Sequence, residues 1–109
     1  MSNTECFRNG VVLCFLLERI KQDAFTALGA RRGDELEHAV SAVSSGITAL
    51  KENVVLAEEC GIRLPDGVVG SLESGLNLLQ SEGDGFRYVD GGIRISKAAR
   101  DAIFDLLPH

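Results

Sequence analysis

The sequence is poor in the residues on which small disulfide-rich and metal-binding proteins depend. Its 109 residues include three cysteines, two histidines, two prolines and no tryptophan. The odd number of cysteines and the lack of a C-x-x-C spacing argue against a disulfide framework and against a zinc knuckle. We therefore expect a reduced, cytoplasmic chain that binds no metal and no cofactor.

Long apolar runs are also missing. The longest covers residues 11–17, far short of the ~20 residues that a membrane-spanning helix requires. Glu5 precedes this run, and Glu18 and Arg19 follow it before any small-residue cleavage site, so the run does not match a signal peptide. These absences predict a soluble protein with no membrane partner.

What the sequence does contain fits a single domain over residues 1–109. Hydrophobic residues make up 45% and charged residues 25% of the chain, a composition that excludes an intrinsically disordered protein. The net charge of −5 is unevenly spread. Residues 1–85 hold seven basic and thirteen acidic residues, whereas residues 86–109 hold four and three. This acidic body argues against an indiscriminate binder of polyanions.

Two long helices are predicted, over residues 3–28 and 34–60. In each, apolar residues recur at steps of three and four, and the second helix carries three heptads of this pattern. The short loop between the helices favours antiparallel pairing. The predicted core stripes are Cys6, Leu13, Leu17, Ile20, Ala24 and Ala27 in the first helix, and Leu36, Val40, Val43, Ile47, Leu50, Val54 and Ala57 in the second.

The sequence of the C-terminal third predicts a change from helix to β-hairpin. A third helix is expected from about residue 68 to residue 81. Residues 86–96 then alternate apolar and polar around Asp90-Gly91-Gly92, which is typical of a β-hairpin. The predicted fold is therefore mainly α: a long antiparallel helical hairpin and a third helix over residues 1–82, then a C-terminal β-hairpin and a short terminal helix over residues 86–107.

Neither histidine lies in a pattern that carries chemistry. His38 and His109 belong to no Ser/His/Asp, Cys/His or H-E-x-x-H arrangement. Asp34 and His38 are one helical turn apart, but a helix cap and a surface residue explain this pair better than two metal ligands do. We therefore expect no catalytic residues and no enzymatic activity.

The long helices present more apolar surface than one helical hairpin can cover, so we expect a dimer and a protein partner. The function that follows is a small acidic, non-enzymatic protein–protein interaction module, an accessory regulator or inhibitor of a larger machine. The interface candidates are surplus apolar residues of the first helix and a stripe of small residues on the second: Val12, Phe15, Leu16, Ala39, Ala42, Gly46 and Ala49.

An alternative function comes from the basic end of the chain. A helix, a hairpin and a closing helix, with clustered Arg87, Arg94, Lys97 and Arg100, locally resemble a winged-helix domain over residues 68–102. The resemblance implies a nucleic-acid-binding regulator whose wing contacts the phosphate backbone. Against it, the helix in the reading position, residues 66–80, holds Asp66 and Glu73 and no basic residue. The other interpretation is that these bases form the solvated face of the hairpin.

Overall fold

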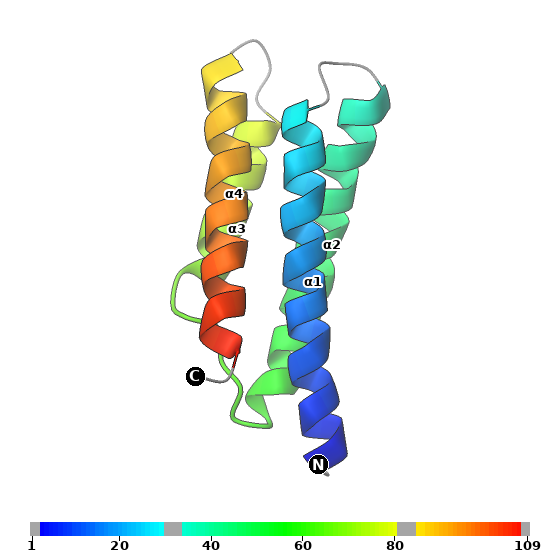
Figure 1. Cartoon of the computed structure of the whole chain (residues 1–109), viewed down its shortest axis with the longest axis vertical. Helices are drawn as coiled ribbons and strands as arrows, with labels where there is room; N and C mark the ends of the chain where they lie inside the picture. Colours follow the sequence, from blue (N-terminus) through cyan, green and yellow to red (C-terminus); the bar gives the residue numbers. More distant parts are fainter. Residues whose placement is uncertain (1–2, 30–33, 81–84, 108–109) are drawn as a thin grey trace.

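The computed structural model describes residues 3–29, 34–80 and 85–107, and these ranges contain four α-helices. The helices are α1 (Asn3–Gly29), α2 (Asp34–Glu58), α3 (Val68–Leu79) and α4 (Gly85–Leu106). They run alternately up and down, each packs against the next, and α4 closes the bundle against α1 (Figure 1). The bundle is elongated, at 48 × 23 × 20 Å. The mainly helical prediction is confirmed.

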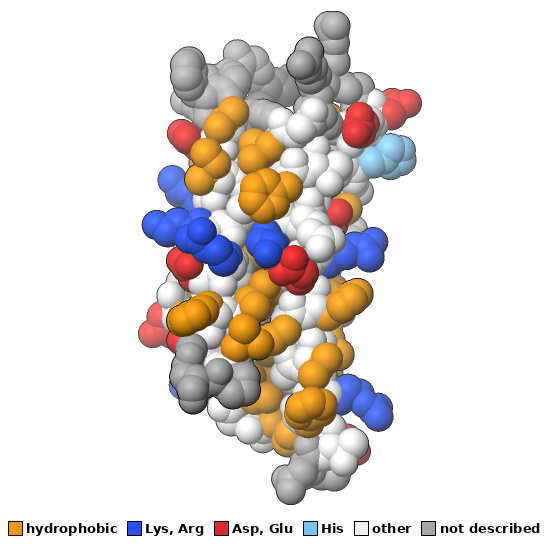
Figure 2. Space-filling model, viewed as in Figure 1, with side chains coloured by type: hydrophobic (Ala, Val, Ile, Leu, Met, Phe, Trp, Pro, Cys, Tyr) orange, Lys and Arg blue, Asp and Glu red, His pale blue; other side chains and the backbone are white. Residues whose placement is uncertain are grey.

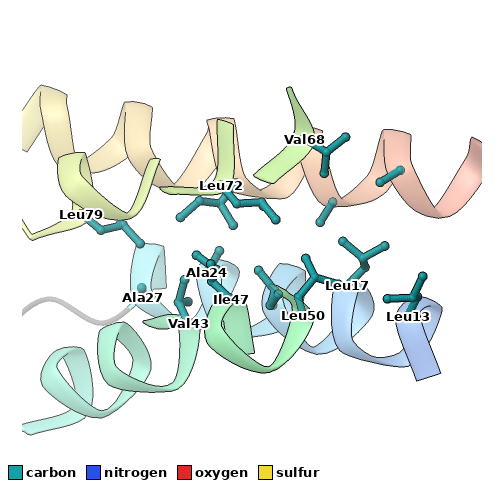
Figure 3. Close-up of a cluster of buried hydrophobic side chains, with 14 of the residues drawn as sticks. Leu13, Leu17, Ala24, Ala27, Val43, Ile47, Leu50, Val68, Leu72 and Leu79 are labelled. Carbon is teal, nitrogen blue, oxygen red and sulfur yellow. The ribbon is translucent and has the colours of Figure 1, made fainter. Parts of the chain in front are cut away.

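The core lies between the four helices, where the stripes of α1 and α2 meet α3 and α4 (Figure 3). Leu13 and Leu17 of α1, Leu50 of α2 and Leu72 of α3 are fully buried. Burial of each such side chain stabilises the fold by about 2 kcal/mol. All residues of the two predicted core stripes are buried or half-buried. The helical period read from the sequence therefore locates the core of both long helices correctly.

The predicted β-hairpin is wrong, and so is the winged-helix-like C-terminal third. Residues 85–106 form one continuous helix, and no strand occurs in the part of the chain that the structure describes. Gly91 and Gly92, which we expected in a turn, are buried inside α4. The alternation of apolar and polar residues around them is therefore a local coincidence and does not report a strand.

Both glycines permit close packing of α4 on its neighbours. A Cβ added to Gly91 would lie 2.6 Å from the carbonyl O of Gly75 in α3, and one added to Gly92 would lie 2.5 Å from the side chain of Leu28 in α1. A glycine inside a helix costs about 1 kcal/mol relative to alanine. Contact with two helices at once offsets this cost. Ile95 continues the buried side of α4 one turn further on.

Two glycines also set the connection from α2 to α3. Gly61 (φ 78°) and Gly67 (φ 85°) have left-handed backbone conformations, which favour glycine. The N–H of Ile62 donates to the carbonyl O of Ala57 at 3.0 Å, so the chain turns back immediately after α2 ends. This turn places Ile62 beside Gly10 of α1, at the end of the bundle where the cavity described below lies.

A disulfide joins Cys6 of α1 to Cys60, two residues beyond α2, with the Cα atoms 5.5 Å apart. The expectation that the chain forms no disulfide is therefore wrong for this pair, whereas Cys14 is a free thiol. The physical reason is that antiparallel pairing of α1 and α2 brings together two cysteines separated by 54 residues. Counting cysteines along the chain does not detect this proximity.

Candidate protein-interaction surface

Large apolar side chains are exposed along one side of the bundle, on α1 and α4. Phe7, Val11 and Phe15 follow each other at four-residue steps and so lie on one face of α1. Their exposed fractions are 75%, 51% and 64%. We call the whole surface the α1–α4 face and define it by eight residues: Phe7, Val11, Phe15, Phe25, Val89, Ile93, Phe104 and Leu107.

A band of charged residues divides this face into two apolar patches. Figure 2 shows basic and acidic side chains across the middle, with apolar side chains above and below them. Two pairs of residues show which parts of α1 and α4 lie at the same height along the bundle. Leu28 contacts the Gly92 position at one end, and Cys14 and Leu107 line the same cavity at the other. Glu18 of α1 therefore lies nearly level with Arg100 of α4.

The two patches differ in size. The larger patch lies at the end of the bundle where α1 begins and α4 ends, and it consists of Phe7, Val11, Phe15, Phe104 and Leu107. The smaller patch lies at the opposite end and consists of Phe25, Val89 and Ile93. The charged band between them consists of Glu18 and Lys21 from α1 and Lys97 and Arg100 from α4.

The larger patch is hollowed by a cavity of about 330 Å³. Besides apolar side chains its lining includes Gly10, the free thiol of Cys14 and the disulfide-bonded Cys6. Burial raises the pKa of the Cys14 thiol above its ordinary value, so this side chain is a neutral thiol at neutral pH. A thiol in such surroundings behaves as a small apolar group and is a weak nucleophile. The cavity therefore offers apolar contact and no acid–base chemistry.

The charged band is held mainly by contacts within each helix. Lys21 Nζ lies 2.9 Å from Glu18 Oε2, and Gln22 Nε2 donates to Glu18 Oε1 at 3.3 Å. The hydrogen bond from Lys21 is the largest cause of a lowered pKa at Glu18, so this carboxylate is ionised at neutral pH. On α4, Arg100 Nε lies 3.6 Å from Asp101 Oδ1, and the Arg100 side chain is 67% exposed.

The interface candidates predicted on α1 lie in different environments. Phe15 belongs to the α1–α4 face, while Val12 and Leu16 are half-buried and Leu16 packs against the core. On α2, Ala39 is buried, and Ala42 and Ala49 are half-buried.

Gly46, the remaining candidate, lies where α2 packs on α1. A Cβ added to it would be 2.8 Å from Ile20 Cγ1. In this position the small residue serves the contact between two helices of the same chain.

The four basic candidates lie on one helix and form no wing. Arg94 donates to Ser74 Oγ of α3 at 3.2 Å, while Lys97 and Arg100 are exposed on α4. Arg87 belongs to α4, but its side chain lies outside the described residues. Because the hairpin is a helix, the geometry that the winged-helix resemblance implies is absent from the described C-terminal third.

Sequence reasoning missed most of the α1–α4 face. Phe7, Phe25 and Phe104 are 75%, 57% and 67% exposed, and none of them was among the predicted interface residues. The four-residue steps from Phe7 through Val11 to Phe15 were a usable signal for an apolar stripe outside the core. On α4 no such signal was readable, because the expected hairpin concealed the helical register of Val89 and Ile93.

The described part of the chain contains no helix that is long and apolar enough to cross a membrane. Within the same residues, no three His, Cys, Asp or Glu side chains come together in a way that could hold a metal ion. Comparison of the chain with protein-family models, with curated proteins and with solved structures finds no match.

Proposed function

We propose that this protein is a small, acidic, non-enzymatic protein–protein interaction module that dimerises and acts as an accessory regulator or inhibitor of a larger machine. The observation that carries the proposal is the α1–α4 face. The exposed parts of its eight apolar side chains amount to roughly 800 Å². The larger of its two patches contributes roughly 550 Å² of this area, which is at the upper end of the about 300–600 Å² that the largest apolar patch of a typical monomer covers, and such patches are often functional.

The area also fits a protein partner. A stable protein–protein interface buries about 800 Å² on each side, with an apolar centre and a polar rim. The four phenylalanines of the face, Phe7, Phe15, Phe25 and Phe104, are the kind of side chain that dominates binding energy in such interfaces.

Matched surface variants test the proposal. Phe104→Glu places a charge within the α1–α4 face, whereas Val55→Glu places one at a similarly exposed apolar position of α2, away from the face. Each variant is expressed in place of the wild-type chain, cross-linked in cells and captured, and the cross-linked proteins are identified.

We expect Phe104→Glu to lose cross-linked protein, either a second copy or another chain, and Val55→Glu to retain it. Equal cross-linking in the two variants, or no cross-linked protein with the wild-type chain, would contradict the proposal. Circular dichroism of both purified variants establishes that the helices are intact.

We also propose a cytoplasmic location, which depends on the redox state of Cys6 and Cys60. Disulfides are rare in the reducing cytosol and persist in oxidising compartments. In the cytoplasm, Cys6 and Cys60 are therefore expected as thiols, although the structure pairs them. Alkylation of free thiols in rapidly acidified cells, followed by mass spectrometry, measures which state is present. A fully oxidised Cys6–Cys60 pair would contradict the cytoplasmic location.

A further inference from the structure

We infer that the α1–α4 face binds a second copy of this chain, across a two-fold axis parallel to the bundle, so that α1 of each protomer packs on α4 of the other. The inference rests on the proposed function and specifies its partner and geometry. In this arrangement each apolar patch meets the same patch of the partner subunit. The charged band of one protomer meets the charged band of the other.

The sizes of the two apolar patches favour this axis. A two-fold axis parallel to the bundle leaves the height of every residue along the bundle unchanged. The patch containing Phe7, Phe15 and Phe104 therefore packs on the same patch of the partner subunit. An axis perpendicular to the bundle would place this five-residue patch on the three-residue patch around Phe25, and part of the larger patch would stay exposed to water. Symmetric dimers bury the same surface on both subunits, and the roughly 800 Å² available on each side matches a stable dimer.

One pair of opposite charges in the band favours the same axis. With α1 packed on α4 of the partner subunit, the ionised carboxylate of Glu18 faces the exposed guanidinium of Arg100. The two-fold axis produces this contact twice. The parallel axis also brings Lys21 nearly level with Lys97 of the partner subunit, so the contact that distinguishes the two axes is the Glu18–Arg100 pair. The perpendicular axis would place α4 on its own copy, where Glu18 and Arg100 would not meet and Arg100 would approach its own duplicate.

Charge reversal at the two positions tests the inference on the purified chain. The variants are Glu18→Arg, Arg100→Glu and the double variant with both changes, and their masses are measured by sedimentation equilibrium at micromolar concentration. The wild-type chain is expected at twice 11.7 kDa. Each single variant creates two like-charge contacts in its own dimer, so we expect its dissociation constant to rise at least about tenfold.

Mixing the two single variants gives the sharpest outcome. In the mixed dimer both contacts pair an arginine with a glutamate, so an equimolar mixture is expected to dimerise where each variant alone does not. The double variant restores both contacts within its own dimer and is expected to associate like the wild type. Glu52→Arg, at an exposed position of α2 away from the face, is the matched control and is expected to leave the mass unchanged.

Several outcomes would overturn the inference. A wild-type chain that sediments at 11.7 kDa removes the second copy and with it the dimer of the proposed function, while cross-linking that depends on Phe104 would still support an interaction module with a different partner. The two-fold arrangement is contradicted if the wild type dimerises and both single variants dimerise equally well. It is also contradicted if the mixture and the double variant both fail to associate. Thermal unfolding of each variant establishes that a lost dimer is not a lost fold.

Discussion

Reduction of the Cys6–Cys60 disulfide is expected to destabilise the fold substantially. The bond joins residues 54 positions apart, and together with the α1–α2 pairing it closes the open end of the helical hairpin. In the chain-entropy description, a cross-link over a loop of this length removes about 4 kcal/mol of conformational freedom from the unfolded chain. The same amount is lost from the free energy of unfolding when the bond is reduced.

The change in free energy translates into a measurable shift of the melting temperature. For a domain of this size, each kcal/mol moves the Tm by about 4 °C, so reduction is expected to lower the Tm by about 15 °C. The assay is thermal unfolding followed by circular dichroism, with and without a reductant. The variant Cys6→Ser/Cys60→Ser is expected to melt at the temperature of the reduced wild type and to be insensitive to reductant.

The control for this experiment is Cys14→Ser. Cys14 is a free thiol, so this variant is expected to keep the full effect of the reductant. Equal melting temperatures for the oxidised and reduced wild-type chain, with the oxidation states verified by alkylation and mass spectrometry, would refute the reasoning. That result would mean that residual structure in the unfolded chain already holds residues 6 and 60 close together, so that the bond removes little further conformational freedom.

Three further predictions concern single side chains. Gly91→Ala is expected to lower the free energy of unfolding by about 2 kcal/mol, because the added methyl meets the backbone of α3. Gly70→Ala is expected to raise the free energy of unfolding by about 0.5 kcal/mol, because no described atom lies within 4 Å of the added methyl. Chemical denaturation compares the two variants. Ser96→Ala is expected to raise the free energy of unfolding by about 1 kcal/mol, because the buried Ser96 Oγ has no hydrogen-bond partner among the described residues. A destabilised variant in the same assay would show that the hydroxyl has a structural role. Lys21 lowers the pKa of Glu18 in the folded state, so the stabilising contribution of Glu18 is present above its ordinary pKa of about 4.3 and is lost as the pH falls through the folded pKa. Glu18→Gln is expected to flatten this part of the curve of unfolding free energy against pH. An unchanged curve would count against the contact between Glu18 and Lys21.

The sequence predicted the structure well where one periodicity dominates. The heptad stripe from Leu36 to Ala57 and the stripe from Leu13 to Ala27 locate the core of α1 and α2, because long apolar stripes at helical spacing have few other ways to be buried. The second predicted helix, residues 34–60, also ends close to the observed end of α2 at Glu58, shortly before Gly61 with its left-handed backbone. These features depend on local chemistry or on a single helix face.

The errors arose where distant contacts decide the local structure. Gly91 and Gly92 have the composition of a turn, and only the approach of α3 and α1 explains why they lie inside a helix. The pairing of Cys6 with Cys60 depends in the same way on how α1 and α2 align. The α1–α4 face followed from neither helix alone, because it required α4 to be recognised as a helix and placed beside α1.

The most direct test of the account compares the mass of the wild-type chain with the masses of Phe104→Glu and Val55→Glu by sedimentation equilibrium at micromolar concentration. If the α1–α4 face is a protein interface between copies of this chain, the wild type and Val55→Glu have twice 11.7 kDa and Phe104→Glu has 11.7 kDa. A wild-type chain of 11.7 kDa, or a Phe104→Glu variant as heavy as the wild type, would contradict the account.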